Sequence, residues 1–376
     1  MALPQYQEKM LVFFELAFQQ TQITAADFVD LIPNNGIGVG VAIPGLVQNI
    51  RESFARTALA IVASGRPLTD AFTTKKVMMT PALMELYAFL DARHVDDNGK
   101  VSDAFAQKNP TLKLYFGTAA GPIPLAQSLD PTSPSYMHWY SPDIASVVYP
   151  VAECNVNPIV FSANAYTLHL LLYGVVDNHK TSATSGNCGE RPLSTASVQM
   201  SAADFTDWRL VAIRPPASGE ATSTFYDLIA LRTASELVLR TPHPGFFTTP
   251  AFFANWSTNQ SNQMRVTLNQ ALIVSTGMAI DGSDTTIPSS APGLDAAHVQ
   301  SGDGCLGCHQ LLDPTRSILS STFTWGYSSQ TDASLVAQKG LFAFQGVVAP
   351  VATIDDFATT LAQHPLVAAA WAQKLC

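Results

Sequence analysis

The sequence predicts a mainly α fold in three parts: a helical N-terminal domain over residues 1–112, a loop-rich middle region or insertion over 113–222, and a second helical domain with a few short strands over 223–376. At 376 residues the chain is long enough for two or three domains and a sizeable core. Apolar residues recur every three or four positions near both ends, as in helices that bury one face. Pro, Gly, Ser and Thr dominate the middle and indicate long surface loops.

The N-terminal domain is expected to contain helices at about 4–20, 24–31, 46–63 and 81–92. The first is amphipathic, with Phe14 and Phe18 on its apolar face. The third ends at Gly65, a residue type common just beyond helix C-termini. The fourth begins at Pro81, directly after the capping residue Thr80.

The remaining elements are expected as helices at about 224–239, 262–276 and 365–376, and as short strands at 342–344 and 347–351. The helix over 262–276 would place Met264, Leu268 and Leu272 on its inner side. The last helix starts with Pro365, which suits a first helical position. Within the middle region, 161–173 reads as one buried segment between loops.

The composition excludes two classes of partner. The net charge is −9 and no cluster of Lys and Arg occurs, so electrostatic capture of nucleic acid is not expected. No stretch of 18 or more apolar residues occurs, so no transmembrane segment is expected. Charged residues make up only 13% of the chain, and the surface must therefore consist largely of neutral polar residues.

The pentapeptide Cys305-Leu306-Gly307-Cys308-His309 is the one motif that names a chemistry. In a C-x-x-C-H motif the two thiols add to the vinyl groups of a haem and the histidine binds the iron, so the porphyrin dictates both spacing and order. Only about one chain in a thousand of this composition would contain the motif by chance. The motif predicts one covalent haem c, bound through Cys305, Cys308 and His309 in a cytochrome c-like haem-attachment domain.

Three other interpretations of the two cysteines remain open. A thioredoxin-like dithiol requires a buried strand before the motif and a helix that begins at it, whereas the preceding residues read as a loop. A zinc site would add one or two of His309, His298 and Cys188, but the usual spacing of a second ligand pair is absent. A plain disulfide between Cys305 and Cys308 is the simplest alternative.

Haem attachment through thioethers takes place after export, so the haem interpretation implies a periplasmic or secreted protein. The sequence begins without the basic segment of a signal peptide and ends in a helix without a C-cap, and we expect truncation at both ends. Cys154 and Cys188 lie in loop-like sequence and suit a disulfide in an oxidising compartment, whereas Cys376 has no evident partner.

The segment around the motif carries further features. They are the aromatic stretch 240–253 with its Thr-Thr-Pro, Arg265 at the start of a helix, a Pro-rich loop, the C-x-x-C-H motif and Asp313-Pro314 after it. With these features residues 239–327 resemble the haem-attachment module of the secreted planctomycete-type cytochrome c family.

Residues 7–92 and 354–376 resemble the helical modules that flank this one in the family, whereas 113–222 carries no such resemblance. The family usually has Asp-Pro-Leu-Gly where this chain has Asp313-Pro314-Thr315-Arg316. The resemblance implies an exported haem c protein. Because the family's modules often occur in large multidomain proteins, it also suits a relay to a redox partner protein or a neighbouring domain.

The second axial ligand decides between functions. No Met follows the motif, and the candidates are His364, His298, Met278, Met264 or no protein ligand. A six-coordinate iron would serve one-electron transfer, which we favour. An open iron would serve a peroxidase-like or oxygenase-like enzyme, and a third alternative is a binding or structural protein that the haem only holds folded.

Arg265 and Arg316 are rare basic residues near the motif in a charge-poor chain. Haem propionates in a partly buried site need positive partners, so we expect at least one of the two arginines to approach a propionate. The alternative is that each caps a helix or pairs with Asp313.

Overall fold

The computed structural model describes residues 3–23, 42–93, 113–116, 123–124, 144–149, 159–162, 202–223, 228–256, 264–287, 305–322 and 340–376. Helices take up 60% of the interpretable residues, and three small sheets contain the strands, so the predicted mainly α class is confirmed. Within these ranges no helix combines the length and apolar character needed to cross a bilayer. The predicted helix at 24–31 lies outside them.

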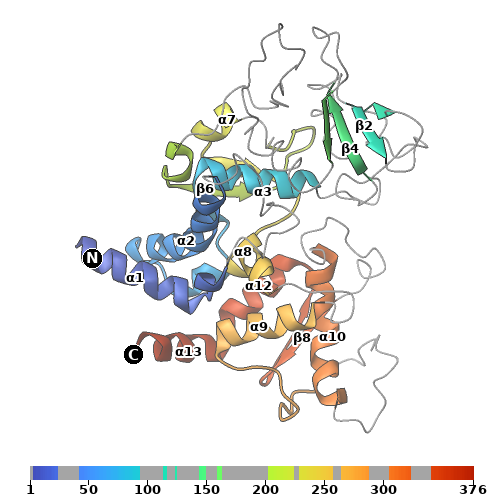
Figure 1. Cartoon of the computed structure of the whole chain (residues 1–376). Helices are drawn as coiled ribbons and strands as arrows, with labels where there is room; N and C mark the ends of the chain where they lie inside the picture. The colour runs from blue at the N-terminus through green and yellow to red at the C-terminus, as the bar shows by residue number, and fades with distance from the viewer. Residues whose placement is uncertain are drawn as a thin grey trace, which may run out of the picture.

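The N-terminal helices are α1 (Pro4–Ala17), α2 (Ala42–Ala63) and α3 (Pro81–Arg93), with short 3-10 turns at Gln20–Gln22 and Leu68–Phe72. They confirm the expected helices at 4–20, 46–63 and 81–92. The cap of α3 is also as predicted, because the Thr80 hydroxyl accepts a hydrogen bond from the Leu83 amide at 3.2 Å. In Figure 1, α1 packs beside α2.

Three strands from distant parts of the sequence form one sheet. Strand β1 (Lys76–Met79) pairs antiparallel with β6 (Arg209–Arg214), which pairs in parallel with β7 (Glu236–Val238). The predicted helix over 224–239 is therefore wrong: only α7 (Leu228–Thr233) is helical in the described part of that range, and β7 follows it. Pairing with β6 and burial of Leu237 and Val238 outweigh the helical pattern.

The middle region contains strands that the sequence analysis did not predict. They are β2 (Lys113–Phe116), β3 (Ile123–Pro124), β4 (Ile144–Tyr149) and β5 (Ile159–Ser162), in one antiparallel sheet of order β3-β2-β4-β5. A 3-10 turn at Ala202–Phe205 precedes β6.

The C-terminal elements are a 3-10 turn at Phe246–Thr248, α8 (Pro250–Asn255), α9 (Arg265–Thr276), α10 (Cys305–Thr322), β8 (Gly340–Phe344), β9 (Val347–Val351), α12 (Ile354–Gln363) and α13 (Pro365–Leu375). The two strands confirm the prediction at 342–344 and 347–351 and form an antiparallel hairpin. Its two-residue turn has positive φ at both Gln345 and Gly346, as a type I′ turn requires.

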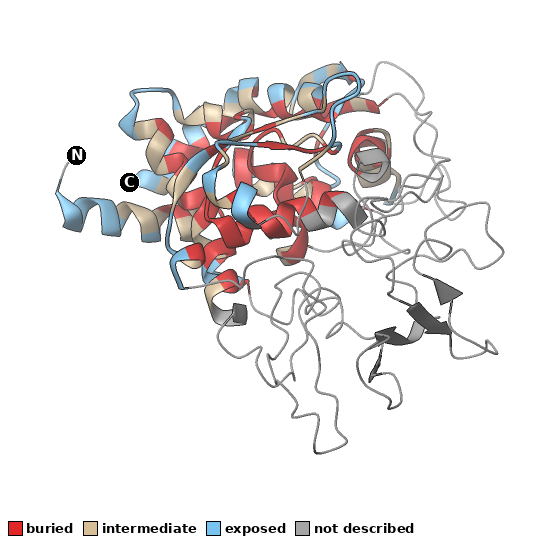
Figure 2. Cartoon of the chain, turned by 90° about the horizontal axis from the view of Figure 1, so that it is seen from above, coloured by how far each residue is buried: buried red, intermediate tan, exposed pale blue. Residues whose placement is uncertain are grey.

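One hydrophobic core joins the two ends of the chain. The centre of the Phe18 ring lies 5.1 Å from the ring centre of Phe54 in α2. The corresponding distances are 4.6 Å to Phe246 and 4.8 Å to Trp371 of α13. Buried residues occupy the centre of the described structure (Figure 2). The described residues of the first and third predicted domains thus share a single core.

Candidate functional site

The C-x-x-C-H motif forms the first turn of α10. Residues 305, 308 and 309 stand at positions i, i+3 and i+4 of the helix, so their side chains share one face. Both motif cysteines are free thiols: Cys305 is exposed, and Cys308 is half-buried against the core. A disulfide between them is therefore not what this structure contains.

The rest of α10 is anchored against the hairpin (Figure 1). The Thr315 hydroxyl donates a hydrogen bond to the Leu341 carbonyl of β8 at 2.7 Å. A Cβ at Gly340 would lie 2.5 Å from Ile318, so the close approach of β8 to the helix requires a glycine there. These contacts fix α10, whose first turn is the motif, against the β8–β9 hairpin.

His309 contacts a buried carboxylate one turn further along α10. Its Nδ1 lies 3.1 Å from Oδ2 of Asp313, whose side chain is 1% exposed. An ionised carboxylate accepts hydrogen bonds and cannot donate them, so Nδ1 is the donor. Nε2 is then the ring nitrogen that would bind a metal, as is usual for metal-binding histidines whose other nitrogen donates to a carboxylate.

Two arginines bind the same carboxylate. Arg265 Nε, at the start of α9, lies 2.6 Å from Oδ1 of Asp313, and Arg316 Nε lies 3.4 Å from that oxygen. Arg316 is only 2% exposed. We call His309, Asp313, Arg265 and Arg316 the α10 charge cluster. This is the alternative pairing expected above, and the contact of either arginine with a propionate stays a prediction.

The loop after α9 passes beside the motif. A Cβ at Gly307 would lie 3.5 Å from the Cα of Gly282. Burial raises the pKa of the Cys308 thiol, and the negative charges of Asp281 and Cys305 raise it further. A redox dithiol depends on an easily formed thiolate, so this environment of Cys308 does not suit one, although the helix that begins at the motif does.

The candidates for a second axial ligand differ in what they contact. His364 is buried; its Nε2 lies 3.2 Å from the Phe344 carbonyl, and its Nδ1 accepts a hydrogen bond from the Leu366 amide as the cap of α13. Met264 is fully buried in the core. Met278 is 41% exposed at the start of the loop that passes the motif, and His298 lies outside the described residues. Met278 is therefore the most accessible of the three described candidates.

The other metal and disulfide predictions fall mostly outside the described ranges. Where side chains are described, no group of three or more His, Cys, Asp and Glu is arranged to hold a metal ion. His298 and Cys188, which a zinc site would need, and the predicted Cys154–Cys188 disulfide lie outside those ranges.

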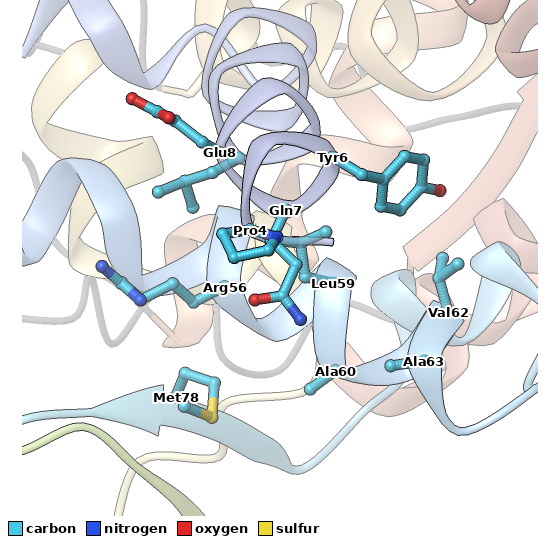
Figure 3. A pocket seen from close by; sticks show the side chains of 11 residues that line it. Pro4, Tyr6, Gln7, Glu8, Arg56, Leu59, Ala60, Val62, Ala63 and Met78 are labelled. Carbon is cyan, nitrogen blue, oxygen red and sulfur yellow. The ribbon is translucent and has the colours of Figure 1, made fainter. Parts of the chain in front are cut away.

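A pocket of about 500 Å³ lies elsewhere, between α1, α2 and β1. Tyr6, Gln7 and Glu8 of α1 stand across it from Arg56 and Leu59 of α2 (Figure 3). Arg56 is already paired with Glu52 at 2.6 Å, and its guanidinium lies 4.7 Å from the ring centre of Trp208. This pocket holds no constellation of reactive groups comparable with that on α10.

Asp313 was not predicted as a site residue, although its spacing of four from His309 was a signal. A helix over 305–313 places residues 305, 309 and 313 on one face, but the sequence predicted only a loop before the motif and not this helix.

Searches against protein-family models, curated proteins and solved structures found no match for this chain.

Proposed function

We propose that this chain binds one haem c covalently through Cys305 and Cys308, with His309 as an axial ligand, and transfers single electrons. The observation that carries the proposal is the first turn of α10, where two free thiols and the histidine share one face and Asp313 accepts from Nδ1 of that histidine. The donor set fits haem, because the motif supplies both thioether sulfurs and an imidazole with its second nitrogen engaged.

Each residue has a distinct task in this proposal. Cys305 and Cys308 would provide the covalent bonds, and His309 would bind the iron through Nε2. When bound, haem c supplies reversible one-electron oxidation and reduction. The chain supplies a fixed histidine, a half-buried second cysteine and a helix held against the β8–β9 hairpin.

Electron transfer also follows the resemblance to the secreted planctomycete-type cytochromes, which itself remains a proposal. An exported location, periplasmic or secreted, is required by the attachment chemistry, and the proposed partner is a redox protein or a neighbouring domain. Of the two arginines, Arg265 has the more exposed side chain, at 13%, and is the better placed to reach a propionate.

One observation favours a second candidate function, a haem c enzyme with an open iron. His364 has both ring nitrogens engaged by backbone groups, and Met264 is buried in the core, so two of the four candidate ligands would have to leave their contacts to bind iron. An iron without a second protein ligand could admit a small oxidant or substrate.

Mass spectrometry of the full chain tests haem attachment. The chain is produced in a host that exports it and attaches haem, and its intact mass is measured after extraction with acid and organic solvent. We expect the mass of the polypeptide plus one haem, and the bare polypeptide mass from the Cys305→Ser, Cys308→Ser double variant. A bare mass from the unmodified chain, with zinc present instead, would contradict the proposal.

Absorption spectra of the same protein separate the two functions. A low-spin spectrum that does not change with carbon monoxide or cyanide supports the electron carrier. A high-spin spectrum with rapid ligand binding supports the enzyme. The Met278→Leu variant then tests the accessible methionine, because loss of the low-spin spectrum in that variant would identify Met278 as the second ligand.

A further inference from the structure

We propose that Asp313 is a positioning residue for His309: it holds the imidazole as the Nδ1–H tautomer, presents Nε2 to the iron, and lowers the reduction potential of that iron. The proposal rests on the proposed haem site and adds to it a residue that the C-x-x-C-H motif does not contain.

The contact geometry carries the first part of the proposal. His309 and Asp313 are one helical turn apart, and the Nδ1–Oδ2 distance of 3.1 Å is that of a hydrogen bond. Because Asp313 is an acceptor, the imidazole proton must lie on Nδ1 when the ring is neutral. The carboxylate thereby selects the nitrogen that faces the iron and fixes the rotation of the ring.

The arginines explain why the carboxylate stays in place. Asp313 is 1% exposed, and a buried carboxylate is stable only when it is paired and hydrogen-bonded. Arg265 reaches Oδ1 from α9, 48 residues away in sequence, while Arg316 approaches the same oxygen from within α10. The histidine contacts the other oxygen, Oδ2. Arginine and histidine groups thus contact both oxygens of the carboxylate.

Electrostatics gives the second part. A negative carboxylate that accepts a hydrogen bond from Nδ1 makes Nε2 a more basic ligand for the iron. A more basic ligand stabilises the ferric state relative to the ferrous state. Arg316 lies 3.4 Å from Oδ1 of Asp313, so its positive charge stands beside the carboxylate. It partly offsets the effect of the carboxylate and so limits how far the potential falls.

The tautomer can be measured without haem. In the full-length chain produced without haem attachment, ¹⁵N NMR of histidine at a pH where the ring is neutral should show the His309 proton on Nδ1. In Asp313→Ala the proton should move mainly to Nε2, the preferred site in water. A His309 proton on Nε2 in the unsubstituted chain would overturn the proposal whether or not haem is attached.

The potential is measured in the haem-loaded chain. Asp313→Asn keeps a hydrogen-bond acceptor but removes the charge, and it should favour the ferrous state at least tenfold, which corresponds to about 59 mV for one electron. Asp281→Asn is the matched control, because it removes a negative charge that acts on Cys308 and leaves both partners of the His309–Asp313 hydrogen bond unchanged. Equal shifts in the two variants would mean a general charge effect and would overturn the positioning role.

The two experiments separate the possible failures. Absence of covalent haem in the mass measurement would refute the proposed function, and the tautomer measurement would still decide the role of Asp313. If Asp313→Asn does not fold, Asp313→Glu, which retains the charge, is measured instead. The equilibrium ratio of ferrous to ferric protein should then stay within threefold of that of the unsubstituted chain, and a larger change would contradict the assignment.

Discussion

The helices α3 and α10 each bury a carboxyl group, and the two groups differ in the partners that surround them. Glu85 on α3 is 1% exposed, and its Oε2 has no hydrogen-bond partner among the described residues. Burial raises its pKa well above the ordinary value, and the nearby charge of Asp204 adds to this. Asp313 on α10 is also buried but contacts His309, Arg265 and Arg316.

The comparison shows that burial alone does not decide whether a carboxyl group carries a charge. Burial penalises the charged form of Glu85, whose Oε2 has no hydrogen-bond partner among the described residues, and so favours the neutral acid. Asp204, whose charge adds to the rise in the Glu85 pKa, already pairs with Arg232 at 2.7 Å. At α10 the chain brings two guanidinium groups to one carboxylate, which balance its buried negative charge beside His309.

The largest expected effect comes from the same isosteric change at both acids. Asp313→Asn should lower the free energy of unfolding by about 3–5 kcal/mol, because two largely buried guanidinium groups lose a negative charge with which they pair. Glu85→Gln should cost much less, since burial already disfavours the charged form of this carboxyl and the amide carries no charge. Urea unfolding of both variants measures the difference, and equal losses would refute the contrast drawn here.

Removal of one arginine should have a smaller effect. Arg265→Gln loses a charge-assisted hydrogen bond to a buried carboxylate, and we expect a loss of about 1.5–3 kcal/mol. Arg66→Gln is the control, because Arg66 pairs with Asp70 at 2.7 Å on an exposed helical turn and should contribute less than about 1 kcal/mol. If the two variants unfold at the same urea concentration, the buried pair stabilises the fold no more than the exposed pair does.

The pH dependence of stability sharpens the description of Glu85. An acid whose pKa is raised by folding binds more protons in the folded than in the unfolded state between the two pKa values. The free energy of unfolding should therefore fall as pH rises above about 4.5, by at most about 1.4 kcal/mol per pH unit from this group. Glu85→Gln should remove that slope, as a difference between variant and unsubstituted chain measured from pH 4 to pH 8. A difference that does not change with pH would contradict the raised pKa.

The smallest expected effect concerns Cys308 in the first turn of α10. Hydrogen bonds from Ser283 hold the pKa of Asp281 below its ordinary value, and the resulting negative charge raises the pKa of the thiol. In the chain without haem, Asp281→Asn should lower the thiol pKa and speed alkylation of Cys308 at pH 8. Peptide mapping distinguishes Cys308 from the exposed Cys305 and Cys376. An unchanged rate would mean that burial alone sets the reactivity.

Local patterns in the sequence determined much of the fold. The helices α1, α2, α3, α9 and α13 and the strands β8 and β9 follow from apolar spacing, capping residues and prolines within a few positions. The C-x-x-C-H motif was equally local, because five adjacent residues suffice to state its chemistry. Such features need no knowledge of distant residues.

Only the tertiary structure decided how distant segments meet. Strand β7 replaced part of a predicted helix because β6 offered a paired edge, and Phe18, Phe246 and Trp371 joined two predicted domains in one core. Asp313 acquired its role because α9 carries Arg265 to it across 48 residues. A pairwise contact of this kind depends on where each element packs, and no local periodicity or spacing encodes that position.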